Sequence, residues 1–181
     1  MKIQRKIRRS SGFTLVELLI VIAIIAVLAG LGFAGFKASI RAANSLAAKN
    51  HVTGLKQALD TYYDDYTQLP DVEGEVLLSD DSNELMAILV GANKVKNPKG
   101  TAFFSAANAK GTSDGIVRSG GSVKLYDPWG EFYRVVLDDD YDQEIEDPFG
   151  GPDPIYGVTA LVYSAGEDKE LGTRDDVKSW E

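Results

Sequence analysis

Residues 12–36 read GFTLVELLIVIAIIAVLAGLGFAGF, the longest apolar segment of the chain. The run from Leu18 to Phe36 has 19 residues without a charged side chain, about 28 Å of helix at 1.5 Å per residue. Because that length matches the hydrocarbon layer of a bilayer, the sequence predicts a membrane-spanning helix over 13–36. Residues 1–12 carry five basic side chains and no acid, which predicts a cytoplasmic N-terminus with the rest of the chain on the other side.

An ordinary secretory signal peptide is the alternative, with small residues near 32–34 as its cleavage region. Two features count against it. The apolar run is longer than a usual signal core, and the carboxylate of Glu17 stands at its start. A charge at the head of a membrane helix is costly unless it is paired, so Glu17 is a candidate functional residue.

The segment Gly12-Phe13-Thr14-Leu15-Val16-Glu17, with its basic leader and apolar run, resembles the prepilin cleavage and methylation motif of type IV pilins and type II secretion pseudopilins. The resemblance implies that a prepilin peptidase removes the leader 1–12 by cutting after Gly12 and methylates the new amine of Phe13. It further implies that Glu17, in the apolar core of a filament, pairs with the Phe13 amine of a neighbouring subunit and sets the axial register. One departure is Ala34, which stands where pilin helices usually have proline.

From Lys37 the helix becomes amphipathic, and we expect it to end near Tyr66, because Leu69-Pro70 disfavours helix. Apolar residues at alternating steps of four and three share one face; they are Ala48, Val52, Leu55, Leu59, Tyr62 and Tyr66. His51 falls outside this stripe, and we interpret it as a solvated histidine and not as a catalytic one.

The periplasmic body expected over 37–181 combines this helix with variable loops over 67–122 and a small sheet with a final loop over 123–181. Residues 83–91 fit a short helix capped by Gly91, and 92–122 read as loop. Strands are predicted at 123–126, 132–137 and 158–163, the last central because it is apolar on both faces. The predicted class is α+β, with a type IV pilin-like fold implied by the resemblance.

The last seventeen residues before Glu181 form the second informative segment. Three carboxylates on a short glycine-bent loop can converge on a hard cation, which takes six to eight oxygen ligands. The pattern S-x-G-x-D…G-T-x-D-D…W over 164–180 resembles the calcium loop of the major type II pseudopilins. The resemblance implies a Ca²⁺ bound by Asp168, Asp175 and Asp176 together with backbone carbonyls, although Lys169 and Glu170 depart from the small residues usual there. The alternative is an acidic, disordered tail.

A second acidic stretch, DDDYDQEIED, covers 138–147. Asp138, Asp140 and Asp142 match the first three ligand positions of an EF-hand loop. The match then fails, because Gln143 replaces the required glycine and Phe149 the glutamate at position twelve. We interpret this stretch as a solvated acidic loop.

Composition excludes several classes of function. The 181-residue chain has no cysteine and one histidine, which excludes a thiol nucleophile and a cysteine-ligated metal centre. Residues 13–181 carry 14 basic against 27 acidic side chains, so no nucleic-acid partner is expected. A local basic patch remains an alternative, formed by Lys94, Lys96, Lys99 and Lys110. No catalytic constellation is found, and the chain is not expected to be an enzyme.

The resemblance therefore implies a structural subunit of a type II secretion pseudopilus, anchored in the bacterial inner membrane and then assembled into a periplasmic filament. Its implied partners are further copies of itself, prepilin peptidase, the inner-membrane assembly platform, minor pseudopilins and, before assembly, membrane lipid. Two alternatives stay open. One is a type IV pilus subunit for adhesion, motility or DNA uptake, and the other is a secreted calcium-binding domain behind an ordinary signal peptide.

Overall fold

The computed structural model describes residues 12–72, 75–78 and 84–181, which form two compact units divided between Arg41 and Ala42. The predicted leader lies outside the described residues, except for Gly12. Helix α1 (Leu15–Tyr66) supplies the turns before this division to the first unit and the remaining turns to the second. The predicted long helix is thus confirmed, with its start at Leu15 and its end at Tyr66.

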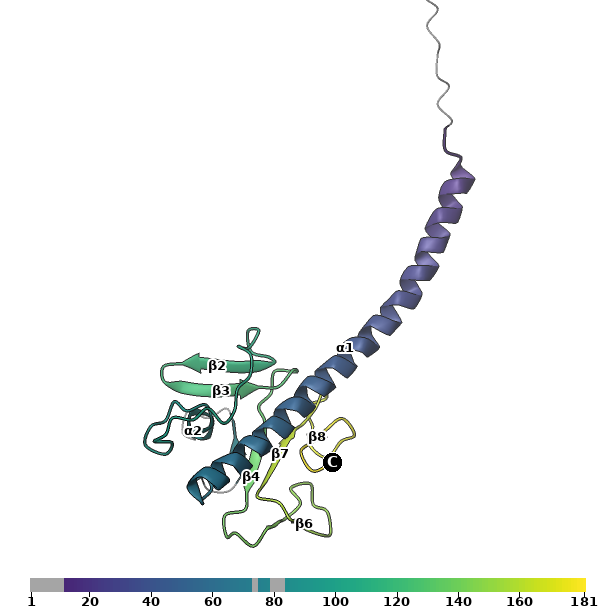
Figure 1. Cartoon of the computed structure of the whole chain (residues 1–181). Helices are drawn as coiled ribbons and strands as arrows, with labels where there is room; N and C mark the ends of the chain where they lie inside the picture. The colour runs from purple at the N-terminus through teal and green to yellow at the C-terminus, as the bar shows by residue number, and fades with distance from the viewer. Residues whose placement is uncertain (1–11, 73–74, 79–83) are drawn as a thin grey trace, which may run out of the picture. The chain divides into compact units, whose positions relative to one another are not determined.

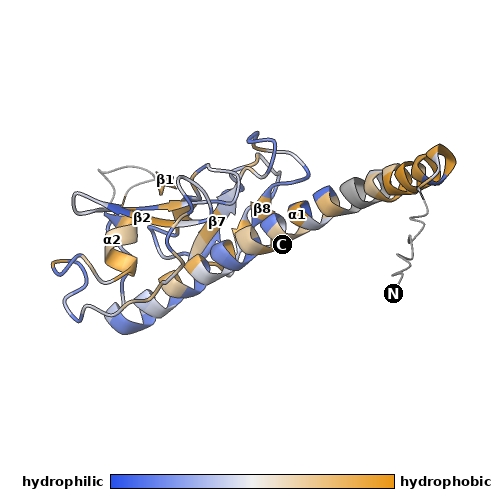
Figure 2. Cartoon of the chain, turned by 90° about the horizontal axis from the view of Figure 1, so that it is seen from above, coloured by the Kyte–Doolittle hydropathy of each residue, from blue (hydrophilic) through white to orange (hydrophobic). Residues whose placement is uncertain are grey.

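In the first unit, the early turns of α1 are apolar around the whole helix. Residues 12–30 are all exposed, and the hydropathy colours show hydrophobic residues on every visible side (Figure 2). Within the described part of the chain, no helix combines the length and apolar character needed to cross a membrane. The membrane span over 13–36 stays a prediction.

In the second unit, the later turns of α1 bury the predicted stripe against the sheet (Figure 1). Five of its six residues are at most 2% exposed, namely Ala48, Val52, Leu55, Leu59 and Tyr62. Tyr66, at the end of the helix, is partly buried against the same core. The period of 3.6 residues therefore identified the packed face correctly.

The main sheet is antiparallel, with strand order β1-β4-β7-β8. Its strands are β1 (Val76–Leu77), β4 (Arg134–Leu137), β7 (Ala160–Ser164) and β8 (Val177–Lys178). All five residues of β7 are buried, and Val135 of β4 pairs with Val162 of β7. The predicted central position of the third strand is confirmed.

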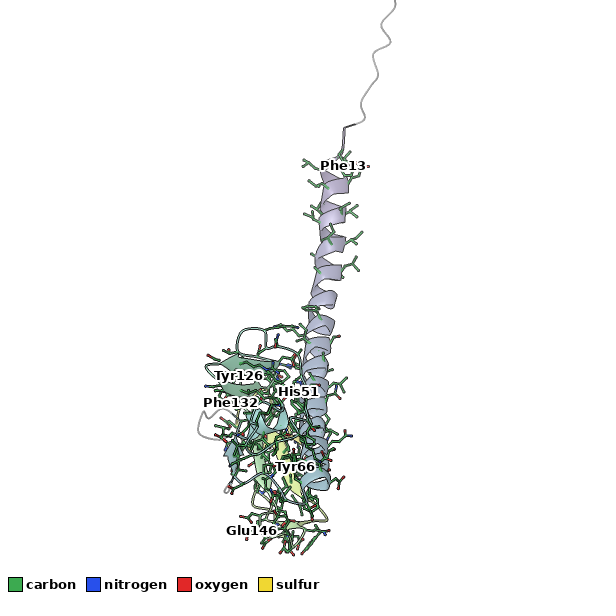
Figure 3. All side chains as sticks on the ribbon, turned by 60° about the vertical axis from the view of Figure 1, so that its left-hand side comes forward. Phe13, His51, Tyr66, Tyr126, Phe132 and Glu146 are labelled. Atoms are coloured by element: carbon green, nitrogen blue, oxygen red, sulfur yellow. The ribbon has the colours of Figure 1, made fainter. Side chains whose placement is uncertain are left out.

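Two hairpins stand apart from this sheet, β2 (Gly115–Ser119) with β3 (Ser122–Tyr126), and β5 (Glu144–Ile145) with β6 (Ile155–Tyr156). The prediction of loop throughout 92–122 was therefore wrong, because β2 begins at Gly115. Gly120 and Gly121 have φ values of 59° and 93°, the left-handed backbone that a tight two-residue hairpin turn requires. At the opposite end of this hairpin from the turn, the rings of Tyr126 and Phe132 lie with centroids 4.5 Å apart (Figure 3).

The short predicted helix is α2 (Leu85–Leu89); Asn83, where the predicted segment begins, lies outside the described residues. Leu85, Ile88 and Leu89 are buried, as their shared face predicted. Gly91 follows with φ 75°, and a Cβ there would lie 2.7 Å from the carbonyl oxygen of Gly100. Only glycine suits this position, which confirms the predicted cap.

Candidate assembly and cation-binding sites

The predicted processing site lies immediately before α1. Phe13 is 75% exposed and stands at the start of the helix (Figure 3). A Cβ built on Gly12 would meet no atom within 4 Å. The bond between the two residues is therefore open to an approaching peptidase, while cleavage itself stays a prediction.

Thr14 and Glu17 form a reciprocal cap on the N-terminus of α1. The Glu17 carboxylate accepts hydrogen bonds from the backbone N–H of Thr14 at 2.8 Å and from its hydroxyl at 2.7 Å. In return, the backbone N–H of Glu17 donates to the Thr14 hydroxyl oxygen at 3.2 Å. This is a capping box, in which two otherwise unpaired helix donors are satisfied.

The capping box gives Glu17 a role that our reading of the sequence missed, although the signal Thr-x-x-Glu before an apolar run was present. In the single subunit, the Glu17 carboxylate is satisfied by its own chain. Its predicted pairing with the Phe13 amine of a neighbouring subunit stays a prediction, and it would have to replace or share these local hydrogen bonds.

The C-terminal loop connects β7 to β8. Aspartate carboxylates of this loop accept hydrogen bonds from its own backbone N–H groups. Asp175 Oδ2 accepts a hydrogen bond from the backbone N–H of Asp168 at 3.0 Å. Asp176 Oδ2 accepts from the N–H of Gly172 at 2.8 Å and of Thr173 at 2.9 Å. The loop is therefore ordered around its carboxylates, and the alternative of a disordered tail does not describe it.

The predicted calcium ligands are not equally available in this loop. Both Asp175 oxygens already accept hydrogen bonds, since Thr173 Oγ1 donates to Oδ1 at 2.7 Å; these bonds hold the Asp175 pKa below its usual range. Asp176 Oδ1, in contrast, is buried without a partner among the described residues. Burial raises the Asp176 pKa, so a cation at this oxygen fits the site.

The three predicted ligands do not form one cluster of ligand atoms. Within residues 12–72, 75–78 and 84–181, the one group of three carboxylates with ligand atoms within 4.8 Å of one another is Asp138, Asp140 and Asp142. Calcium binding by Asp168, Asp175 and Asp176 together stays a prediction. The arrangement favours Asp176 as the member with a free, buried acceptor.

Asp127 anchors the start of this loop, and sequence reasoning missed it. It is fully buried, and its Oδ2 accepts a hydrogen bond from Ser164 Oγ at 2.6 Å. Its Oδ1 accepts from the backbone N–H groups of Trp129 and Glu131 at 2.9 and 2.8 Å. The turn after β3 is thereby fixed to the last residue of β7, where the C-terminal loop begins.

We expect Asp127→Ala to lower the free energy of unfolding by about 2–4 kcal/mol, because the buried Ser164 hydroxyl and two partly buried backbone N–H groups lose their acceptor. Asp127→Asn keeps an acceptor and should cost less.

Burial raises the Asp127 pKa above its ordinary 3.8, so its ionisation opposes folding. The stability of the wild type relative to the Asn variant should therefore fall as the pH rises from about 4. Denaturant unfolding across this range measures the difference, and a pH-independent difference would contradict it.

The interpretation of His51 as solvated was wrong. His51 Nδ1 lies 2.9 Å from the Tyr133 hydroxyl, and its ring makes edge contacts with the rings of Phe104 and Tyr133. Burial lowers its pKa, which favours the neutral imidazole. The α1 face that packs on the body is wider than the apolar stripe and includes this amphipathic ring.

Comparison with known proteins places these sites in context. The family described as "Prokaryotic N-terminal methylation motif" matches residues 7–33. The chain is 27% identical over 175 residues to the type II secretion system core protein G of Aeromonas hydrophila, covering 96% of this chain and 94% of the relative. It is 28% identical over 172 residues to the core protein G of Escherichia coli strain K12, covering 95% of this chain and 92% of the relative.

A third relative, the core protein G of Pectobacterium carotovorum subsp. carotovorum, is 26% identical over 172 residues, covering 95% of this chain and 85% of the relative. No solved structure gives a significant match. The methylation motif around Phe13 and the similarity along nearly the whole chain together confirm the predicted resemblance to the major pseudopilins of type II secretion systems.

Proposed function

We propose that this chain is a structural subunit of a type II secretion pseudopilus and acts by assembly, not by catalysis. The observation that carries the proposal is the apolar first part of α1, which follows directly on Gly12 and Phe13. A helix that is apolar on all sides needs apolar surroundings on all sides. Lipid supplies them before assembly, and the equivalent helices of neighbouring subunits supply them in a filament.

In this proposal, prepilin peptidase cuts after Gly12 and methylates the amine of Phe13. The helix over 13–36 sits in the inner membrane with its N-terminus in the cytoplasm, as the basic residues before it favour, and the body lies in the periplasm. An assembly platform and minor pseudopilins are the expected partners during growth of the filament. The acidic excess of the body argues against a nucleic-acid partner.

The proposal includes one Ca²⁺ in the C-terminal loop. Asp176 would contribute its buried free oxygen, with Asp168, Asp175 and nearby backbone carbonyls as further ligands. A cation there would compensate the cost of a buried carboxylate oxygen that has no hydrogen-bond donor. It would also hold the loop between β7 and β8 closed.

Processing gives the direct test. Co-expression of the full chain with a prepilin peptidase, followed by mass spectrometry and N-terminal sequencing, should yield a mature chain that starts at methylated Phe13. Gly12→Ala, which adds a Cβ next to the scissile bond, should reduce cleavage without changing the fold, since that position is unobstructed. An intact Met1 or a start beyond Gly32 would refute the proposal, the latter in favour of an ordinary signal peptide.

Loss of protein export on deletion of the gene distinguishes a pseudopilus subunit from a surface pilus subunit. Deletion of the gene should stop export of secreted proteins, and the full-length chain should restore it. Normal export together with lost surface filaments would instead support a type IV pilus subunit.

A further inference from the structure

The acidic segment after β4 gathers three carboxylates at one point. Asp138, Asp140 and Asp142 present oxygens that all lie within 4.8 Å of one another. Two ligands of one Ca²⁺, each at about 2.4 Å from the ion, can be at most about 4.8 Å apart. The spacing of the three oxygens therefore suits a single cation.

Asp138 supplies an independent observation. The residue is 3% exposed, which corrects the expectation that this whole loop is solvated. Its Oδ2 accepts a hydrogen bond from the backbone N–H of Gln143 at 3.0 Å. Its Oδ1 is buried and has no hydrogen-bond partner in the described part of the chain. A buried carboxylate oxygen without a donor is costly and points to a ligand at that atom.

The charges around the cluster point the same way. Among the described residues, no basic side chain forms an ion pair with any of its three members. The ligand oxygens of all three carboxylates lie within 4.8 Å of one another. Like charges this close need either a proton or a cation between them.

The backbone also removes one sequence-based objection to a cation in this loop. Gln143 stands where an EF-hand loop requires glycine for its sharp turn, yet it adopts that left-handed conformation with φ 63°. The bidentate glutamate of an EF-hand is still missing, since Phe149 stands at position twelve. A cation here would therefore keep several water ligands on the side where Asp140 and Asp142 are exposed.

We propose that Asp138, Asp140 and Asp142 form a second divalent-cation site, of the calcium class, separate from the C-terminal loop. The proposal goes beyond the pseudopilin function and does not depend on it. Three carboxylate oxygens and no nitrogen or sulfur ligand select a hard cation. Calcium accepts an irregular, partly hydrated shell more readily than magnesium, which demands a near-ideal octahedron.

Such a cation would stabilise the end of α1. Tyr141, between two of the ligands, accepts a hydrogen bond through its hydroxyl from the backbone N–H of Leu69 at 3.2 Å. Its ring also lies 6.1 Å from the ring of Tyr63 on α1. Fixing the loop around Tyr141 would hold it against the point where α1 gives way to the following loop.

The test measures calcium stoichiometry in the full chain, solubilised in detergent, by equilibrium dialysis with radioactive Ca²⁺. The double change Asp140→Asn with Asp142→Asn removes two exposed ligands and leaves the buried Asp138 in place. We expect it to lower bound calcium by one ion per chain, both in the wild type and in an Asp176→Asn background. Asp139→Asn, which removes one negative charge at an exposed neighbouring residue, should bind as much calcium as its parent.

Thermal unfolding provides the second readout. Without calcium, the double variant should melt at a higher temperature than the wild type, because repulsion between carboxylates is relieved. With calcium, its melting temperature should rise less than that of the wild type. Unchanged stoichiometry in the double variant overturns the site, whatever happens at Asp176. Displacement of the ion by an equal concentration of Mg²⁺ overturns the calcium class.

Discussion

A Glu17→Ala subunit should be cleaved after Gly12 and inserted into the membrane, yet form no filaments. In a bundle of apolar helices, removing one member of a buried ion pair leaves the other charge uncompensated, at a cost of about 3–5 kcal/mol. Each subunit would repeat this loss, so the filament yield should drop below detection. Electron microscopy of sheared filaments, with immunoblots of the processed subunit, measures both results.

The capping box around Glu17 makes two matched controls necessary. Glu17→Gln removes the charge but keeps a side chain that can still cap the helix, so it should also fail to assemble. Thr14→Ala keeps the charge and weakens the cap by about 1 kcal/mol, so it should assemble. If Thr14→Ala fails as Glu17→Ala does, while Glu17→Gln forms filaments, the role of Glu17 is helix capping and not pairing between subunits.

An Asp176→Asn variant should respond to calcium in a way that an ordinary destabilised variant does not. The wild-type carboxylate has a buried oxygen without a partner, so removing its charge should keep or raise the melting temperature in chelator. In calcium, the variant should lose the stabilisation due to binding, about 2.7 kcal/mol when calcium exceeds its dissociation constant a hundredfold. Thermal unfolding in calcium and in chelator measures both effects.

Glu170→Gln is the matched control for this experiment, because Glu170 is exposed in the same loop and the change of charge is the same. It should retain the full response to calcium. Asp175→Ala is less informative: both its oxygens accept hydrogen bonds within the loop, so stability would drop with or without the ion. An Asp176→Asn variant that loses equal stability in both conditions would exclude the proposed ligand.

The sequence predicted those parts of the fold in which periodicity and burial agree. The stripe on α1 and the strand around Val162 bury large apolar side chains, and this pattern is visible without coordinates. The hairpin at Gly120 and Gly121 was missed, although two glycines between short strands are a known turn signal. Ile116 and Leu125 are buried, but most of the other residues of the hairpin are polar or partly buried, so the hydrophobic pattern there is weak.

The residues of the candidate sites also divide into those that a local sequence pattern identifies and those that it does not. Gly12, Phe13 and Glu17 were identified because their motif is contiguous, and the cap by Thr14 was readable from the same six residues. Asp127 was not identified, and Asp138 was noticed for its EF-hand spacing but assigned to a solvated loop, because the burial of both depends on the tertiary fold and not on a local pattern. Ser164 reaches Asp127 only through the pairing of β4 with β7, which no local pattern specifies.

The two outer strands of the main sheet, β1 and β8, are each only two residues long. A long, exposed edge would offer unpaired backbone groups to the sheet of a second molecule and favour uncontrolled aggregation. Edges this short offer few backbone groups with which another strand could pair. Short edges therefore disfavour amyloid-like stacking of crowded copies, and in the proposed filament they leave association to α1.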